Sequence, residues 1–222
     1  MIWPNICVDN FFNNPEEIVK YANSLEYSPH LKSPGIKSEP LHTVDSDFFT
    51  FVNFKILSVI YPHQYRNLEF NASTYFVKVP PNFPSDGWVH DDAAEGFGMT
   101  SIVYLSKNLD AGTCIYKKKT TWKQSKIDQQ IKHDHFANFH KNILNKDIEK
   151  YKKENNSFYE ETIRYKSVYN RLISFDASSL HAAVPYIDKH SKEDRLTLIS
   201  FFTDIRHSTA PLKYPLPESR RL

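Results

Sequence analysis

The stretch Trp88-Val89-His90-Asp91-Asp92 constrains this chain more than any other. If it lies on a β-strand, residues i and i+2 project from the same face, so His90 and Asp92 converge while Asp91 points away. One imidazole and one carboxylate make two thirds of a facial metal site, and the third ligand has to come from a distant strand. His181 is the candidate. Two histidines and one carboxylate with open positions opposite them suit a non-haem Fe(II) that activates O₂.

A single arginine follows this candidate ligand. Arg195 stands at the start of an apolar strand that continues to Phe202. A guanidinium on a strand destined for a core needs an anionic partner, and its planar fork suits bidentate pairing with a carboxylate. The alternative is a surface ion pair with Asp194 or Glu193, which would contribute little to stability.

Four blocks now stand in one order: Trp88 to Asp92; Thr100 to Ser106 followed by Ala111 to Tyr116; Asn170 to Pro185; and Arg195 to Thr197. In these blocks the sequence resembles the Fe(II)/2-oxoglutarate-dependent oxygenase superfamily, and most of all its prolyl-4-hydroxylase-like branch. The blocks cover most of the second half of the chain, apart from an insertion. Ordered blocks are much more specific than any one of them.

The resemblance implies a mainly β fold with added helices, built on a double-stranded β-helix of the jelly-roll, cupin-like kind. It also implies that the iron ligands, which form the catalytic centre, are His90, Asp92 and His181. The residues implied in binding the distal carboxylate of 2-oxoglutarate are Arg195, with Tyr104 or Thr197 adding a hydrogen bond.

The same resemblance implies a hydroxylase that uses Fe(II), O₂ and 2-oxoglutarate, with ascorbate as a reductant. It would hydroxylate an unactivated C–H bond, of a peptidyl proline or an amino acid, and release succinate and CO₂. A non-catalytic, cupin-like barrel that binds a metal and a small ligand is the alternative, as is a module whose insertion binds a partner protein.

Each chosen residue also has a purely structural interpretation. His181 could be a satisfied core histidine, and Tyr104 could be an ordinary aromatic residue of a strand. Asp91 is the rival of Asp92, because a β-bulge beside the site would exchange the carboxylate that faces the metal. In the insertion, His133, His135 and His140 are more typical of solvated helix histidines than of a second metal site.

Composition narrows the class of protein. The chain has 222 residues and a formal net charge of +2, with no basic block, so we expect no nucleic-acid partner. Its two cysteines, Cys7 and Cys114, are far apart, which argues against a disulfide framework. The start has no signal-peptide pattern, and no apolar stretch reaches the length of a membrane span, so we expect a cytoplasmic protein.

We expect one domain over residues 1–222, with helical support in 1–69, a β-helix core in 70–116 and 168–206, and a helical insertion in 117–167. Asn14 and Pro15 predict a helix that ends near Tyr27, and a second helix begins at Ser46 or Asp47 and stops before Pro62. Residues 28–42 read as a loop, and 70–79 as a strand. The insertion is a candidate lid, substrate-binding element or homodimer contact.

Overall fold

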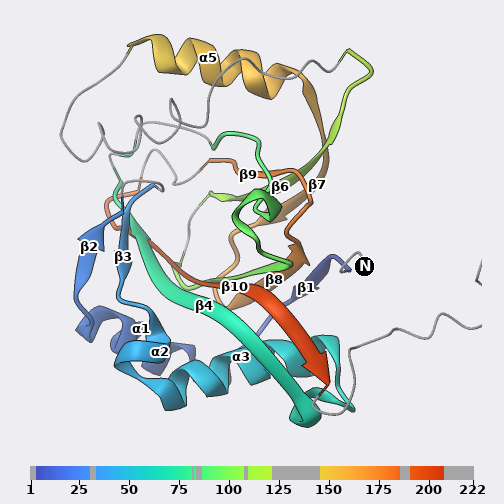
Figure 1. The fold of residues 1–222 in the computed structure, drawn as a ribbon. Coiled ribbons are helices and arrows are strands. Elements are labelled where there is room, and N and C mark those ends of the chain that lie inside the picture. Colours follow the sequence, from blue (N-terminus) through green and yellow to red (C-terminus); the bar gives the residue numbers. More distant parts are fainter. Residues whose placement is uncertain are drawn as a thin grey trace, which may run out of the picture.

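The structure, a computed structural model, describes residues 4–30, 34–81, 83, 87–107, 110–121, 146–185 and 191–207. Two antiparallel sheets dominate this part of the chain (Figure 1). The larger sheet has seven strands, in the order β1 (Ile6–Val8), β8 (Arg171–Asp176), β5 (Met99–Tyr104), β10 (Arg195–His207), β4 (Leu68–Val79), β3 (Ile36–Ser38) and β2 (Tyr27–Pro29). The smaller sheet has three, in the order β7 (Tyr159–Lys166), β6 (Gly112–Lys118) and β9 (His181–Ala183). The predicted fold class, a mainly β jelly roll with added helices, is confirmed.

Three helices cover one face of the larger sheet, as Figure 1 shows. They are α1 (Pro15–Ser24), α2 (Leu41–Val44) and α3 (Ser46–Ile60). The buried side chains of Leu41, Val52 and Leu57 belong to the same apolar cluster as residues of the sheet. None of the described helices is long and apolar enough to cross a membrane. The N-terminal helices therefore support the sheet from outside, as the sequence led us to expect.

Strand β10 shows how alternation separates the helix-covered face of the sheet from its other face. Leu196, Leu198 and Phe202 join the apolar cluster beneath the helices. The residues that alternate with this set, Thr197, Ile199 and Phe201, line a cavity on the opposite face. Because side chains along a strand alternate between the faces, one strand contributes both to the core and to the cavity.

Two predicted elements of the N-terminal part are confirmed. Helix α3 stops before Pro62, and its first turn is capped by Asp45, whose carboxylate accepts a hydrogen bond from the Phe48 N–H at 2.8 Å. Strand β4 begins two residues earlier than predicted, at Leu68, and its residues Tyr75, Val77 and Val79 pack in one cluster.

Other predictions for this part were wrong. Helix α1 ends at Ser24 and not near Tyr27, because Leu25 is already extended and Tyr27 begins β2. The Asn14 side chain makes no capping hydrogen bond. The predicted loop over 28–42 instead contains β3 and α2. Pairing of β3 with β4 makes part of this segment a strand, and Pro29 lies in the edge strand β2, where a proline is tolerated.

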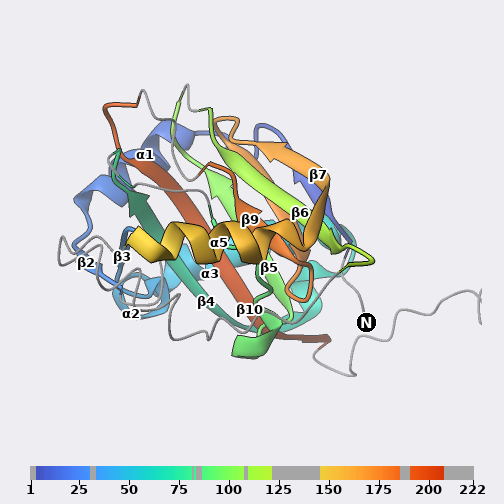
Figure 2. The ribbon, with the colours of Figure 1, turned by 90° about the horizontal axis from the view of Figure 1, so that it is seen from above.

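The limits of the insertion also differ from the prediction. Strand β6 continues to Lys118, and β7 occupies Tyr159–Lys166, where a helical insertion was expected. The two strands pair with each other, and this pairing, which no local periodicity reveals, determines their structure. Helix α5 (Lys146–Ser157) precedes β7 and lies on the side of the molecule opposite α1 to α3 (Figures 1 and 2).

Asn170 joins the N-terminal segment to the turn before β8. Its backbone is left-handed, with φ 61°, and its side-chain amide donates to the Phe12 carbonyl and accepts from the Phe12 N–H, both at 2.8 Å. Asparagine tolerates this backbone conformation better than most residues. We expect Asn170→Ala to lower the free energy of unfolding by about 4 kcal/mol, through two orphaned buried groups and the left-handed backbone. Urea denaturation measures this.

Asn170→Gly is the matched control, because glycine removes the hydrogen bonds but accepts the backbone conformation. It should be less destabilising than alanine by about 1 kcal/mol. Equal stability of Asn170→Ala and the unmodified protein would contradict this account.

Candidate metal centre

A short backbone ladder brings the two distant histidines together. The His90 N–H donates to the His181 carbonyl at 3.0 Å, and the His181 N–H donates to the His90 carbonyl at 2.8 Å. The imidazole rings lie side by side, with centroids 4.5 Å apart. The structure therefore places next to each other two residues that are far apart in the chain, as the sequence predicted.

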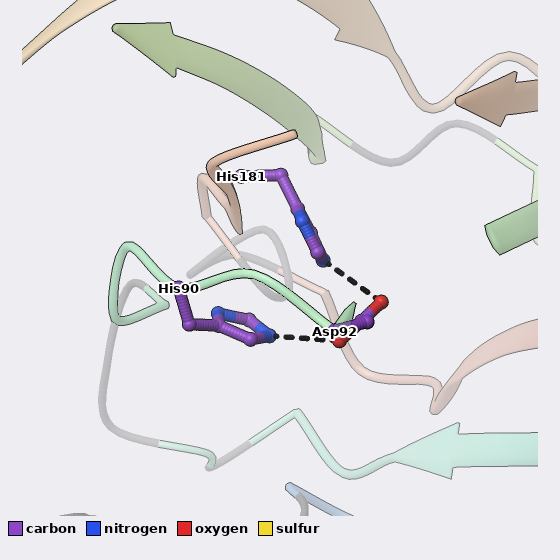
Figure 3. Close-up of side chains that lie close together, drawn as sticks. All are labelled: His90, Asp92 and His181. Carbon is purple, nitrogen blue, oxygen red and sulfur yellow. Dashed lines mark ion pairs between the residues drawn. The ribbon is translucent and has the colours of Figure 1, made fainter. Parts of the chain in front are cut away.

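Asp92 lies against both rings. One carboxylate oxygen is 3.5 Å from the His90 Nε2, and the other is 3.4 Å from the His181 Nε2 (Figure 3). Its backbone is not extended, since φ is −96° and ψ is −7°, and it opens the 3₁₀ turn η2 (Ala93–Glu95). The premise of a strand over this stretch was therefore wrong, because only His90 forms a β-bridge, although the two side chains converge as predicted.

Both imidazoles present the same nitrogen to the carboxylate. The Nδ1 atom of His90 lies 2.7 Å from the Trp88 carbonyl, and that of His181 lies 2.9 Å from the Ser179 carbonyl. A carbonyl can only accept, so each neutral ring carries its proton on Nδ1 and presents an unprotonated Nε2. These two carbonyls fix the tautomers and ring orientations. The sequence could not identify them, because they belong to the backbone.

The carboxylate of Asp92 is held in its ionised form. It is buried, with 9% of the residue exposed, and Thr100 donates to it from its hydroxyl at 2.7 Å. Burial opposes ionisation, but the positive charge that His181 and His90 carry when they are protonated and the hydrogen bond from Thr100 outweigh it, so the pKa of Asp92 lies well below its usual value. Thr100 is a residue of the site that sequence reasoning missed, although its strand was recognised.

The donor set fits a divalent metal ion. Two unprotonated nitrogens and a carboxylate face one another, and their ligand atoms all lie within 4.8 Å of one another. Acceptors placed this closely repel unless a cation lies between them. A first-row metal about 2.1 Å from each ligand would separate neighbouring ligand atoms by about 3 Å, close to the distances from the Asp92 oxygens. The residues therefore fit such an ion with only small adjustments.

The three side chains line a cavity of about 140 Å³ between the sheets. Arg195 lines the same cavity and is 5% exposed, whereas Asp194 and Glu193 are exposed. The guanidinium is thus part of the cavity wall and not a surface group, which rules out the alternative of a surface ion pair. A larger groove of about 570 Å³ lies elsewhere on the surface and contains none of the three candidate ligands.

The two other predicted residues lie close to this guanidinium. Thr197 lines the cavity and pairs in register with Tyr104 on β5. The Tyr104 ring lies 5.5 Å from the Arg195 guanidinium, and its hydroxyl donates to the Thr113 hydroxyl at 2.8 Å. Burial raises the pKa of Tyr104 to about 12, so the phenol stays protonated near neutral pH. Thr113, which also lines the cavity, was not singled out from the sequence.

The remaining candidates are also placed by the structure, or lie outside it. Asp91, the rival carboxylate, is absent from the cavity wall and from the cluster of potential ligands. Within the described ranges, the triad is the one cluster of three potential ligands. His133, His135 and His140 lie outside the described residues.

Comparison with protein families matches residues 3–202 to DUF6445, described as a family of unknown function. The chain belongs to this family. A comparison with curated proteins finds no match.

Among solved structures, the DUF6445 chain is similar to a prolyl hydroxylase from Trichoplax adhaerens in complex with a hypoxia inducible factor peptide fragment, with 10% identity, 89% of this chain and 82% of the other covered, and a TM-score of 0.52. It is also similar to HygX from Streptomyces hygroscopicus, with nickel and 2-oxoglutarate bound: the identity is 12%, 89% of this chain and 82% of the other are covered, and the TM-score is 0.50. A third similar structure is the non-heme alpha ketoglutarate dependent epimerase SnoN from nogalamycin biosynthesis. Its identity is 12%, 91% of this chain and 79% of the other are covered, and the TM-score is 0.51. This DUF6445 chain thus has the fold of 2-oxoglutarate and Fe(II) oxygenases, as its sequence resemblance implied.

Helix α5 holds the segment that precedes His90. The Asn156 amide donates to the Gly87 carbonyl at 2.9 Å and accepts from the Val89 N–H at 2.9 Å. Asn155 donates to the Val89 carbonyl at 3.3 Å. On its other side Gly87 donates to the Ala183 carbonyl of β9, and a Cβ at Gly87 would lie 2.8 Å from the Ala183 nitrogen. The segment is thus fixed from both sides.

This arrangement predicts that α5 contributes to metal affinity without contacting the metal. Asn156→Ala should weaken Co(II) binding about 10-fold, because the backbone of the His90 segment loses its two amide contacts. Removal of groups that support metal ligands commonly lowers metal affinity by about this factor or more. Titration followed by the visible absorption of Co(II) measures the affinity. Lys153→Ala, at an exposed position of the same helix, is the control and should bind as the unmodified protein does. Equal affinities of both variants would contradict a role for Asn156.

Proposed function

We propose that this DUF6445 chain is a Fe(II)- and 2-oxoglutarate-dependent dioxygenase that hydroxylates an unactivated C–H bond, with release of succinate and CO₂. The observation that carries the proposal is the pairing, in one cavity, of a two-histidine, one-carboxylate cluster with a buried guanidinium. Such a donor set is characteristic of non-haem Fe(II). The fold shared with 2-oxoglutarate oxygenases supports the proposal.

Each residue has a definite task in this proposal. His90, Asp92 and His181 would hold the metal, and the carbonyls of Trp88 and Ser179 would keep both Nε2 atoms turned toward it. The bound iron supplies the O₂-activating redox chemistry, which no side chain of the protein can provide.

The far end of the cavity would orient the cosubstrate. Arg195 presents a planar fork that suits a carboxylate, and Thr197 stands two residues along the same cavity-facing side of β10. Tyr104 is placed to support the guanidinium with its ring, since its hydroxyl already donates to Thr113. The apolar walls formed by Val77, Val79, Ile102 and Ile199 exclude water from the reacting atoms.

A peptidyl proline or an amino acid is the substrate that we propose, because the sequence resembles the prolyl-4-hydroxylase-like branch and one of the similar structures contains a peptide. Cys7 and Cys114 are both free thiols, which suits the reducing cytoplasmic compartment that we propose. Ascorbate as reductant, and the insertion as lid, substrate-binding element or homodimer contact, stay predictions.

The carboxylate ligand provides the first test. Asp92→Ala should abolish Co(II) binding and lower the 2-oxoglutarate-dependent release of succinate at least 100-fold, because the metal loses its only anionic ligand from the protein. Asp91→Ala, the adjacent carboxylate outside the cluster, should retain both properties. Loss of succinate release in Asp91→Ala but not in Asp92→Ala would reverse the assignment. An unmodified protein that binds metal and 2-oxoglutarate but never releases succinate would be a binding module and not an enzyme.

The guanidinium of Arg195 provides the second test of the proposed function. Arg195→Met should raise the KM for 2-oxoglutarate at least 10-fold, because a charge-assisted bidentate contact is lost, while Co(II) affinity stays the same. Initial rates of succinate release at varied 2-oxoglutarate measure this. An unchanged KM would show that the distal carboxylate binds elsewhere.

A further inference from the structure

A second cation lines the cavity, and the sequence analysis did not single it out. Lys37 on β3 pairs in register with Val77 on β4, which in turn pairs with Thr197 on β10. Cross-strand partners share one face of a sheet, so this row places Lys37 on the cavity side, two strand spacings or about 10 Å from β10. Lys37 belongs to the cavity wall.

The Lys37 ammonium extends toward the metal cluster and away from Arg195. Its Nζ lies 5.2 Å from the centre of the Tyr75 ring, and Tyr75 pairs with Ile199, further along β10 from Arg195. Burial lowers the pKa of Lys37, while the carboxylates of Glu95 and Asp92 partly offset this effect, so both carboxylates are within electrostatic reach. The two cations of the cavity thus serve opposite ends.

No carboxylate of the described residues is committed to Lys37. Asp92 is engaged with both imidazoles and with Thr100. Glu95 is exposed, and the part of the chain that the structure describes contains no ion pair within 4.0 Å between it and Lys37. A partly buried ammonium without a paired anion is unfavourable, so an anion from outside the protein would be stabilised there.

The charges of the proposed complex lead to the same conclusion. A divalent metal, Asp92, Arg195 and the two carboxylates of 2-oxoglutarate together carry no net charge. Among the described residues that line the cavity, Lys37 would then be the one positive charge left without an anion. A substrate carboxylate placed near the reacting carbon would form an ion pair with this ammonium.

We propose that Lys37 is a specificity-determining residue that binds the carboxylate of the substrate, and that the substrate is a small carboxylic acid such as a free amino acid. This inference rests on the proposed function and selects between its two substrate classes. An internal peptidyl proline carries no charge near its ring, whereas a free amino acid carries its carboxylate within a few bonds of its side-chain carbons.

The test compares free L-amino acids with their carboxamides and with capped prolyl peptides. Succinate release by the Fe(II)-loaded protein should be accelerated by at least one of the acids, and not by its carboxamide or by a capped peptide. Lys37→Met should raise the KM for that acid at least 10-fold, a much larger change than in the KM for 2-oxoglutarate. Lys37→Arg should recover part of the loss.

Binding without turnover gives an independent readout. Calorimetric titration of the Ni(II)- and 2-oxoglutarate-loaded protein with the same acid should show the same loss of affinity in Lys37→Met. Lys78→Met is the matched control, since Lys78 stands next to Val77 in β4 and does not line this cavity. Its affinity should equal that of the unmodified protein.

The outcomes separate the two proposals. A protein that binds no metal, or never converts 2-oxoglutarate, contradicts the proposed function itself. An active protein that no acid accelerates, that carboxamides or capped peptides accelerate equally, or whose Lys37→Met variant keeps the KM for the acid, overturns the role of Lys37 alone.

Discussion

The two backbone hydrogen bonds between His90 and His181 are the contact on which the candidate site depends. They join a segment before β5 to the short strand β9, and so set two imidazoles side by side at the edge of the smaller sheet. Asp92 can approach both rings because the chain turns immediately after the bridge, where its N–H bonds to the Ala177 carbonyl. One local pairing thus positions all three side chains.

The sequence predicted much of this arrangement, for a reason that particular residues make clear. Few residues carry metal-binding or anion-binding chemistry in the order of His90, Asp92, His181 and Arg195, so this order carries information that composition does not. Their side chains do converge in one cavity. Their roles in binding iron and cosubstrate stay proposals, whereas the fold class is confirmed.

Features that depend on non-local pairing were not predictable. Strand β7 has a polar, charged sequence, and it is a strand because β6 lies beside it. The hairpin of β2 and β3 looked like a proline-rich loop for the same reason. The Trp88 and Ser179 carbonyls, and the backbone contacts of Asn156, involve groups that every residue has, so no pattern of side chains could point to them.

The position of Lys37 has a consequence for how this architecture can diversify. The proposed ligands and the cosubstrate arginine lie on β9, β10 and the segment between β4 and β5, whereas Lys37 lies on a short hairpin at the margin of the larger sheet. Marginal hairpins tolerate exchange far better than central strands do. In the proposed enzyme, replacement of that one hairpin would therefore change the molecule that is bound, while the proposed metal and cosubstrate sites are inherited intact.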